Sequence, residues 1–348
     1  MLTKERKTLS LDHCDVIKVF MMISVMFYHC ICLWSGTGWF NQPPAESSRI
    51  LAFIAQWFNS FHIYVFTFVS GYLFYFLKYE KERYKSFVKD TVDRAKRLLI
   101  PYVVTSVFWV IPFYAFFFDT SVKNVVWKFV FATSPNQLWF LVMIFVVFVL
   151  FYLVSDLFLK CNFFLGFVIS VGIYIVATIG AVLVPNVFQI WTAGKYIFFY
   201  YMGFAFRRYK DNVFYKVPWI CYLVSHVALL AFGFFYLPEK SGIVSKLASI
   251  AISPVTSTVG MLMVVIGLSK FKYERLKNCT VFKLLSKHNF FMYLVHQQII
   301  YCVISLLNGR VLTPILVLSN FAISLSVSLL MGVLISRIPV VKRAVGYK

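Results

Sequence analysis

Long apolar runs recur along the chain and are separated by short polar connections. A helix needs about 20 residues to cross roughly 30 Å of hydrocarbon. Ten runs approach that length, at approximately 16–34, 58–77, 98–118, 138–154, 163–183, 190–206, 218–236, 250–268, 288–306 and 312–335. The runs are continuous rather than alternating, which predicts helices instead of barrel strands. We therefore expect an all-α fold, a polytopic membrane helical bundle of about ten transmembrane helices.

Two of the predicted spans leave alternatives open. The sixth, 190–206, is the weakest, and residues 51–57 fit an outer interfacial helix as well as the second span. The first run lacks the small-x-small cleavage site of a signal peptide, so we expect it to be retained. No soluble domain or repeat interrupts the pattern. It predicts one integral-membrane domain over residues 1–348, with short tails at about 1–15 and 336–348.

Composition excludes the water-soluble classes of protein. The chain is 61% apolar and 14% charged, whereas globular proteins are about 45–50% apolar and about 25% charged. Its seven cysteines form no C-x-x-C pair and lie mostly in or beside apolar runs. We interpret them as packing residues and expect neither a disulfide nor a metal site.

Basic residues dominate the charge and lie between the apolar runs. Lys and Arg number 34 against 13 Asp and Glu, a net charge of +21. With a cytoplasmic N-terminus, 26 basic residues fall on the inner side, seven fall on the outer side, and Lys18 lies within the first span. This bias follows the positive-inside rule and predicts two cytoplasmic termini with basic loops facing membrane lipids. Since no motif for reading nucleic acid is present, we expect no nucleic-acid partner.

The first span carries two ionisable side chains, which are costly at membrane depth and normally mark a site. Lys18 and His29 are 11 residues apart, so on a helix they share one face about 16 Å apart along the axis. Asp15 precedes Lys18 by three residues and can pair with it. A snorkelling lysine beside a structural histidine is the alternative interpretation.

The next two spans add further polar groups. The second opens with His62, near the outer surface and at a depth comparable with His29, and continues to Ser70. Arg94 and Arg97, at i and i+3, lie where a basic inner loop enters the third span. Such a pair is compatible with a topology anchor, and also with bidentate contacts to a phosphate or pyrophosphate.

Five short patterns follow one another in an order that resembles the acyltransferase 3 family of membrane O-acyltransferases. They are Asp15-x-x-Lys18 with His29, Phe61-His62 through Phe66 to Ser70-Gly71-Tyr72, Arg94-x-x-Arg97 with Leu98 to Pro101-Tyr102, Gln137-Leu138-Trp139-Phe140-Leu141, and Ser286-Lys287-His288-Asn289-Phe290 with Tyr293-Leu294-x-x-His296. The departure is Lys18, which stands where the family usually has Arg and which lacks the fork geometry of a guanidinium.

The resemblance implies an enzyme that transfers an acyl group, commonly acetyl from acetyl-CoA, to a hydroxyl, most often on a cell-envelope sugar. A sugar hydroxyl needs a general base at neutral pH, and histidine has a suitable pKa. His29 is the candidate catalytic residue, either as that base or as the carrier of an acyl-imidazole. Acetyl-CoA is expected as a co-substrate, with no bound cofactor, in the cytoplasmic (inner) membrane of a bacterium.

The resemblance also assigns the remaining candidates. The donor would be bound on the inner side by Arg94 and Arg97, together with Lys18. The acceptor, an envelope polysaccharide or lipid-linked sugar, would lie on the outer side, toward His62, Gln137 and Trp139. Trp139 taken alone is equally compatible with an aromatic-belt anchor. The acceptor-binding or supporting candidates are His62, Gln137, Trp139, His296, Asp15 and Ser70, of which His296 is structural or donor-lining. We interpret His13, His226 and His288 as surface or packing residues.

Two other function classes remain open. A transporter or exporter could move a lipid-linked sugar or polysaccharide without acyl transfer, but such proteins more often show helices broken by Gly or Pro in matching halves, and we find none. A polysaccharide polymerase is also polytopic, but it usually carries a large outer loop. The outer connections here are short.

Reporters fused at the C-terminus test the predicted orientation. A phosphatase that is active only outside the cytoplasm should stay inactive there, because an even number of crossings returns the chain to the inner side. The same phosphatase fused after Gly309, in the predicted last outer loop, should be active and serves as the control. Phosphatase activity at the C-terminus would contradict the charge-based topology.

Overall fold

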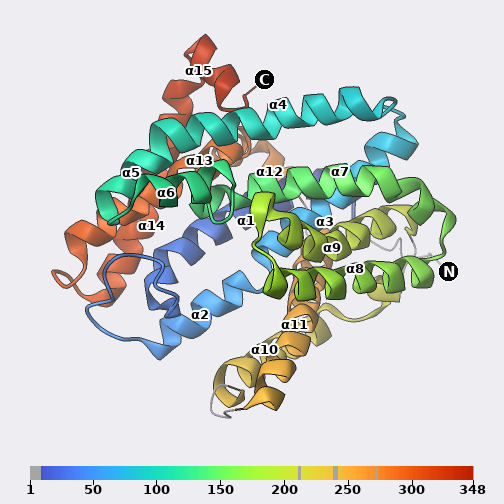
Figure 1. Ribbon diagram of the computed structural model, residues 1–348, viewed down its shortest axis with the longest axis horizontal. Helices are drawn as coiled ribbons and strands as arrows, with labels where there is room; N and C mark the ends of the chain where they lie inside the picture. Colours follow the sequence, from blue (N-terminus) through green and yellow to red (C-terminus); the bar gives the residue numbers. More distant parts are fainter. Residues whose placement is uncertain (1–8, 211–212, 238–241, 271–272, 348) are drawn as a thin grey trace. The chain divides into compact units, whose positions relative to one another are not determined.

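The computed structural model of the chain describes residues 9–210, 213–237, 242–270 and 273–347, which form helices, turns and loops without a strand (Figure 1). The α-helices are α1 (Leu11–Ile31), α2 (Arg49–Asn59), α3 (His62–Tyr75), α4 (Phe87–Thr105), α5 (Ile111–Phe117), α6 (Val122–Val125), α7 (Trp139–Lys160), α8 (Phe163–Leu183), α9 (Ile190–Arg208), α10 (Trp219–Ala231), α11 (Ile243–Ser269), α12 (Glu274–Asn278), α13 (Thr280–Leu307), α14 (Thr313–Ile335) and α15 (Pro339–Ala344). The predicted all-α fold is confirmed.

Nine helical stretches among the described residues are long and apolar enough to cross a membrane. They are Leu11–Ser35, Arg49–Glu80, Phe87–Phe117, Asn136–Lys160, Phe163–Leu183, Trp219–Tyr236, Ala248–Ser269, Thr280–Leu307 and Thr313–Ile335. The predicted membrane bundle is therefore confirmed. The side on which the termini lie stays a prediction.

Two expected spans differ from the helices observed. Residues 51–57 belong to α2, which joins α3 through a turn at Ser60 and Phe61, so the second apolar stretch starts at Arg49. The sixth expected span is present as the helix α9 but is not among the nine apolar stretches. Lys195, Arg207 and several tyrosines lower its mean hydropathy, although most of its side chains are buried.

The chain divides into two compact units, each made of two segments distant in sequence. Unit 1 contains residues 1–69 and 208–287, and unit 2 contains residues 70–207 and 288–348. No single cut along the chain separates them, because each unit combines an early and a late segment. The expected single domain over 1–348 stays a prediction.

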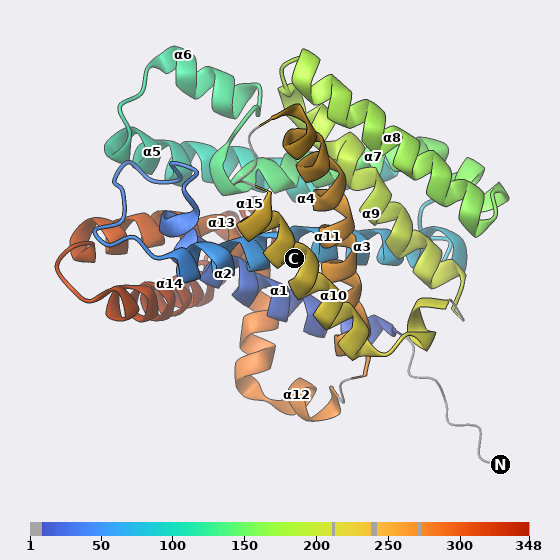
Figure 2. The ribbon, with the colours of Figure 1, turned by 90° about the horizontal axis from the view of Figure 1, so that it is seen from below.

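In unit 1, α10 packs against α11 where two glycines leave room for large rings. The ring of His226 lies over Gly260, where an added Cβ would be 2.4 Å from the imidazole. Trp219 lies over Gly267 in the same way and donates its indole N–H to the Met263 carbonyl at 2.8 Å. The two helices run side by side in Figure 1 and in Figure 2. Small residues thus let a polar and an aromatic ring fill the interface.

The core of unit 2 is aromatic and centres on Phe74. Its ring contacts those of Phe148, Phe151 and Tyr200, with centroids 5.6–5.8 Å apart. One turn earlier on α3, Gly71 meets the backbone of Tyr200, where an added Cβ would lie 1.9 Å from the carbonyl oxygen. Glycine at this position of the Ser-Gly pair therefore allows α3 and α9 to pack backbone to backbone.

Replacing Gly71 tests this close approach. Gly71→Ala should lower the free energy of unfolding by about 1–3 kcal/mol or more, because the added methyl forces α3 and α9 apart. The control is Gly172→Ala on α8, where a Cβ meets nothing within 4 Å. Thermal unfolding of the purified protein in detergent measures both variants, and equal midpoints would contradict the packing.

Candidate active site

The ten residues predicted for the site are divided between the two units. Unit 1 contains Asp15, Lys18, His29 and His62, and unit 2 contains Ser70, Arg94, Arg97, Gln137, Trp139 and His296.

In unit 1, His29 and His62 both contact Tyr28. The Tyr28 ring centroid is 5.0 Å from each imidazole centroid. His62 is buried, and its Nδ1 lies 2.5 Å from the Phe58 carbonyl oxygen. Because that oxygen can only accept, Nδ1 carries the proton, and Nε2 of the neutral ring keeps its lone pair. His29, on the last turn of α1, is partly exposed and is the more accessible of the two imidazoles.

Trp39 stacks on His29 from the loop that follows α1. The two ring centroids are 5.8 Å apart and the planes differ by 14°. Gly36 and Gly38 have φ angles of +71° and +63°, which glycine adopts at little cost, and they reverse the chain toward the helix end. Sequence analysis missed Trp39. The Gly-Thr-Gly turn signal was visible, but it does not tell where the turn directs the following indole.

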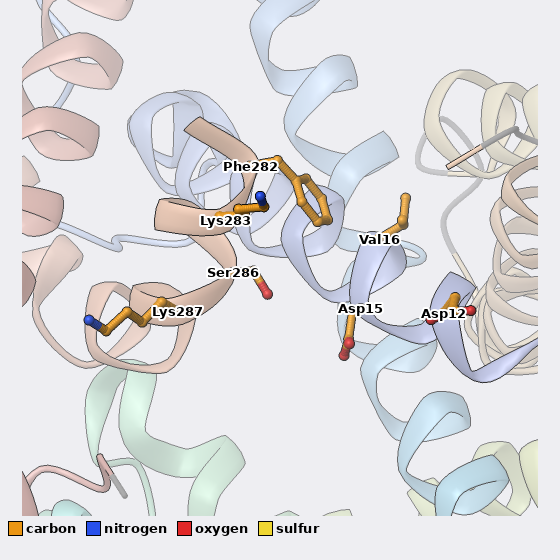
Figure 3. A pocket seen from close by; sticks show the side chains of 7 residues that line it. All are labelled: Asp12, Asp15, Val16, Phe282, Lys283, Ser286 and Lys287. Carbon is orange, nitrogen blue, oxygen red and sulfur yellow. The ribbon is translucent and has the colours of Figure 1, made fainter. Parts of the chain in front are cut away.

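At the other end of α1, the expected pair of Asp15 and Lys18 is present. The Lys18 ammonium lies 3.1 Å from the Asp15 carboxylate, and both side chains are exposed by more than a third. Asp15 also borders an open cavity of about 350 Å³ between the first turns of α1 and α13 (Figure 3). The lining residues are Asp12, Asp15, Val16, Phe282, Lys283, Ser286 and Lys287. Lys18 is not among them, so its charge is directed at Asp15 rather than into this cavity.

In unit 2, Arg94 and Arg97 lie on the first half of α4. The helix begins after Ser86, whose side chain caps Lys89 N–H while Asp90 accepts from Ser86 N–H at 3.1 Å. The Arg94 guanidinium lies over the Phe148 ring, 5.2 Å from its centroid. Its Nε is buried without a hydrogen-bond partner among the described residues. The capped first turn thus fixes where α4 begins, and so which of its residues faces Phe148 of α7.

Neither guanidinium is neutralised by a carboxylate in the part of the chain that the structure describes. Arg94 and Arg97 repel each other electrostatically. The charges of both arginines act on Tyr84, in the preceding loop. Burial raises the pKa of the Tyr84 hydroxyl, and the two arginines lower it. Sequence analysis did not single out Tyr84, because a tyrosine in a basic loop carries no signal of its own.

Two other cations of unit 2, Arg207 and Lys78, have acidic partners. Arg207 makes a bidentate pair with Glu80, at 2.8 and 2.5 Å, and donates to the Tyr72 hydroxyl at 2.9 Å. Lys78 pairs with Asp156 at 3.0 Å. Several other basic side chains of this unit, such as Lys96 and Lys128, likewise make no ion pair among the described residues, so the feature that distinguishes Arg94 is its buried Nε.

Gln137 is committed to α13. Its amide nitrogen donates to the Leu294 carbonyl at 2.9 Å and to the Gln298 amide oxygen at 2.7 Å, and Gln298 donates back at 3.1 Å. Tyr293 donates to the Gln137 carbonyl. These bonds join the start of α7 to α13, so Gln137 has few remaining hydrogen-bonding positions for an acceptor. Sequence analysis missed Gln298, whose importance depends on this partner.

The remaining candidates in unit 2 differ in exposure. His296 is fully buried, and its Nδ1 donates to the Tyr293 and Met292 carbonyls at 2.9 and 3.1 Å. Trp139 is partly exposed and packs edge-on against Tyr196, with centroids 5.9 Å apart. Ser70 is also partly exposed, on α3 immediately before the close contact at Gly71. Of these three side chains, His296 is the least accessible to a substrate.

A family model described as an acyltransferase domain matches residues 12–337, nearly the whole chain and parts of both units. No curated protein and no solved structure matches the chain. The match agrees with the ordered motifs of the sequence and with the apolar helices of the structure. The chain belongs to the acyltransferase 3 family.

Proposed function

We propose that this chain is a membrane-bound O-acetyltransferase that moves an acetyl group from cytoplasmic acetyl-CoA to a hydroxyl of a cell-surface polysaccharide or lipid-linked sugar. The observation that carries the proposal is the pair of guanidinium groups on α4 that has no carboxylate partner among the described residues. We propose the cytoplasmic membrane of a bacterium as its location. Acetyl-CoA acts as a co-substrate.

The guanidinium pair supports a phosphate-bearing donor. A buried guanidinium edge without an acceptor costs free energy unless a ligand supplies one. Phosphate oxygens suit this role because they accept two parallel hydrogen bonds from a guanidinium. Coenzyme A carries three phosphate groups, whereas the acetyl-sugar product carries none at the reacting end. We therefore assign the two arginines to the donor.

His29 supports the transfer step. As a general base, its imidazole takes the proton of the acceptor hydroxyl while that oxygen attacks the thioester carbonyl. The new C–O bond replaces the C–S bond, and the thiolate of coenzyme A leaves and takes up the proton. In the covalent alternative, His29 first accepts the acetyl group and then passes it to the hydroxyl. Both routes need an accessible imidazole, and partial exposure favours His29 over the buried His62.

Replacing His29 tests the transfer step. His29→Ala and His29→Gln should both reduce O-acetylation of the envelope saccharide to background, because neither side chain can hold a proton at neutral pH. His13→Gln is the matched control, since His13 caps the start of α1 and should leave acetylation unchanged. The acetyl content released by mild alkali from cells with equal protein levels is the measurement. Full acetylation with His29→Ala would exclude His29 as base and as acyl carrier.

Arginine-to-lysine changes test the donor site. The double variant Arg94→Lys, Arg97→Lys keeps the charge but loses the planar fork, so affinity for acetyl-CoA should fall about tenfold or more. The control is Arg337→Lys with Arg343→Lys, an equal exchange near the C-terminus. Isothermal titration of the purified proteins with acetyl-CoA gives the dissociation constants. Unchanged affinity would reduce Arg94 and Arg97 to topology anchors, and no binding by the native protein would favour the exporter.

A further inference from the structure

Trp39 stands beside the candidate base in a position that nothing in the family motifs of this chain assigns. Its indole is nearly parallel to the His29 imidazole, with 5.8 Å between centroids. Rings in contact face to face without offset would have centroids about 3.5–4 Å apart, so these two are displaced sideways, as aromatic pairs prefer. Part of the indole face therefore extends past the rim of the imidazole.

The loop that carries Trp39 is held in place by its own contacts. Trp34 donates its indole N–H to the Glu46 carbonyl at 2.8 Å, which closes the loop across 12 residues. Ser35 donates to the Cys32 carbonyl at 2.6 Å and contacts the Thr37 hydroxyl at 2.8 Å. Trp39 itself is partly exposed. The indole is thus positioned by a defined loop, with surface left for another contact.

An indole face next to a base is suited to one kind of acceptor. A pyranose ring presents polarised C–H groups on one face, which pack on the electron-rich face of an aromatic ring, while its hydroxyls project from the rim. A sugar lying on Trp39 beyond the imidazole would bring a rim hydroxyl to the rim of the His29 ring. An open-chain polyol has no such flat apolar face.

We infer that Trp39 is the acceptor platform, on which a cyclic sugar stacks so that one of its hydroxyls meets the edge of His29. This inference rests on the proposed function and specifies its acceptor as a ring sugar. It makes Trp39 a determinant of acceptor binding that acts on the acceptor and not on the donor. Loss of the indole should therefore change one Michaelis constant only.

The test uses purified full-length protein, labelled acetyl-CoA and, as acceptor, the de-O-acetylated envelope saccharide of the expressing cells. Trp39→Ala should raise the KM for the saccharide about tenfold and leave the KM for acetyl-CoA unchanged. Trp39→Phe, which keeps a smaller aromatic face, should restore most of the affinity. Trp127→Ala is the matched control, because Trp127 is an exposed tryptophan of unit 2 and should change neither constant.

The possible results separate the two proposals. An unchanged saccharide KM in Trp39→Ala, or equal transfer by the native protein to sorbitol and to the saccharide, would overturn the platform while acyl transfer stands. No transfer by the native protein to any acceptor would instead overturn the proposed function. A Trp39→Ala protein that has also lost acetyl-CoA binding is misfolded, and Trp39→Leu, which keeps bulk without an aromatic face, then decides: a tenfold higher saccharide KM with an unchanged KM for acetyl-CoA supports the platform, and a native saccharide KM contradicts it.

Discussion

The absence of water from the hydrocarbon layer is the constraint on which this structure depends, because every polar group inside it must find a partner in the protein. At the polar ends of the helices of unit 2, partly buried cations also find partners: Arg207 makes a bidentate pair with Glu80, and Lys78 pairs with Asp156. Arg94 does not, since its Nε is buried without a partner among the described residues. Burial of this Nε without an acceptor costs free energy, and a carboxylate beside Arg94 would have removed that cost. Its absence is expected where a ligand provides the missing oxygens.

The same constraint explains why α13 is the most buried of the nine apolar stretches. Four successive carbonyls, Met292 to Val295, each accept a side-chain donor in addition to their place in the helix. The donors are His296, Gln137 and Trp109. Carbonyl oxygens have a second lone pair that the helical bond leaves unused. A helix surrounded by protein can therefore accept hydrogen bonds from side chains such as Gln137 and Trp109, which lipid tails cannot provide.

Sequence reasoning succeeded where one local property decides the outcome and stopped where two distant segments must meet. Apolar length alone predicted the helices, and residue spacing predicted the ion pair of Asp15 with Lys18. The amide pair of Gln137 with Gln298 spans 161 residues, and the stack of Trp39 on His29 depends on two positive φ angles in a loop. Neither follows from a period or a composition. The low hydropathy of α9 was visible, but its burial was not, because burial depends on its neighbours.

The two histidines that contact Tyr28 show how burial, rather than residue type, divides the roles within a site. Both are imidazoles at one end of unit 1, and the sequence alone ranks them only by their motifs. His62 donates its Nδ1–H to the Phe58 carbonyl and is 2% exposed, so its tautomer is fixed and it cannot meet a bulky substrate directly. His29 is partly exposed at the end of α1, with Tyr28 and Trp39 beside it. A base must both bind a proton and release it, and that exchange needs the access that partial exposure gives His29 and that burial denies His62.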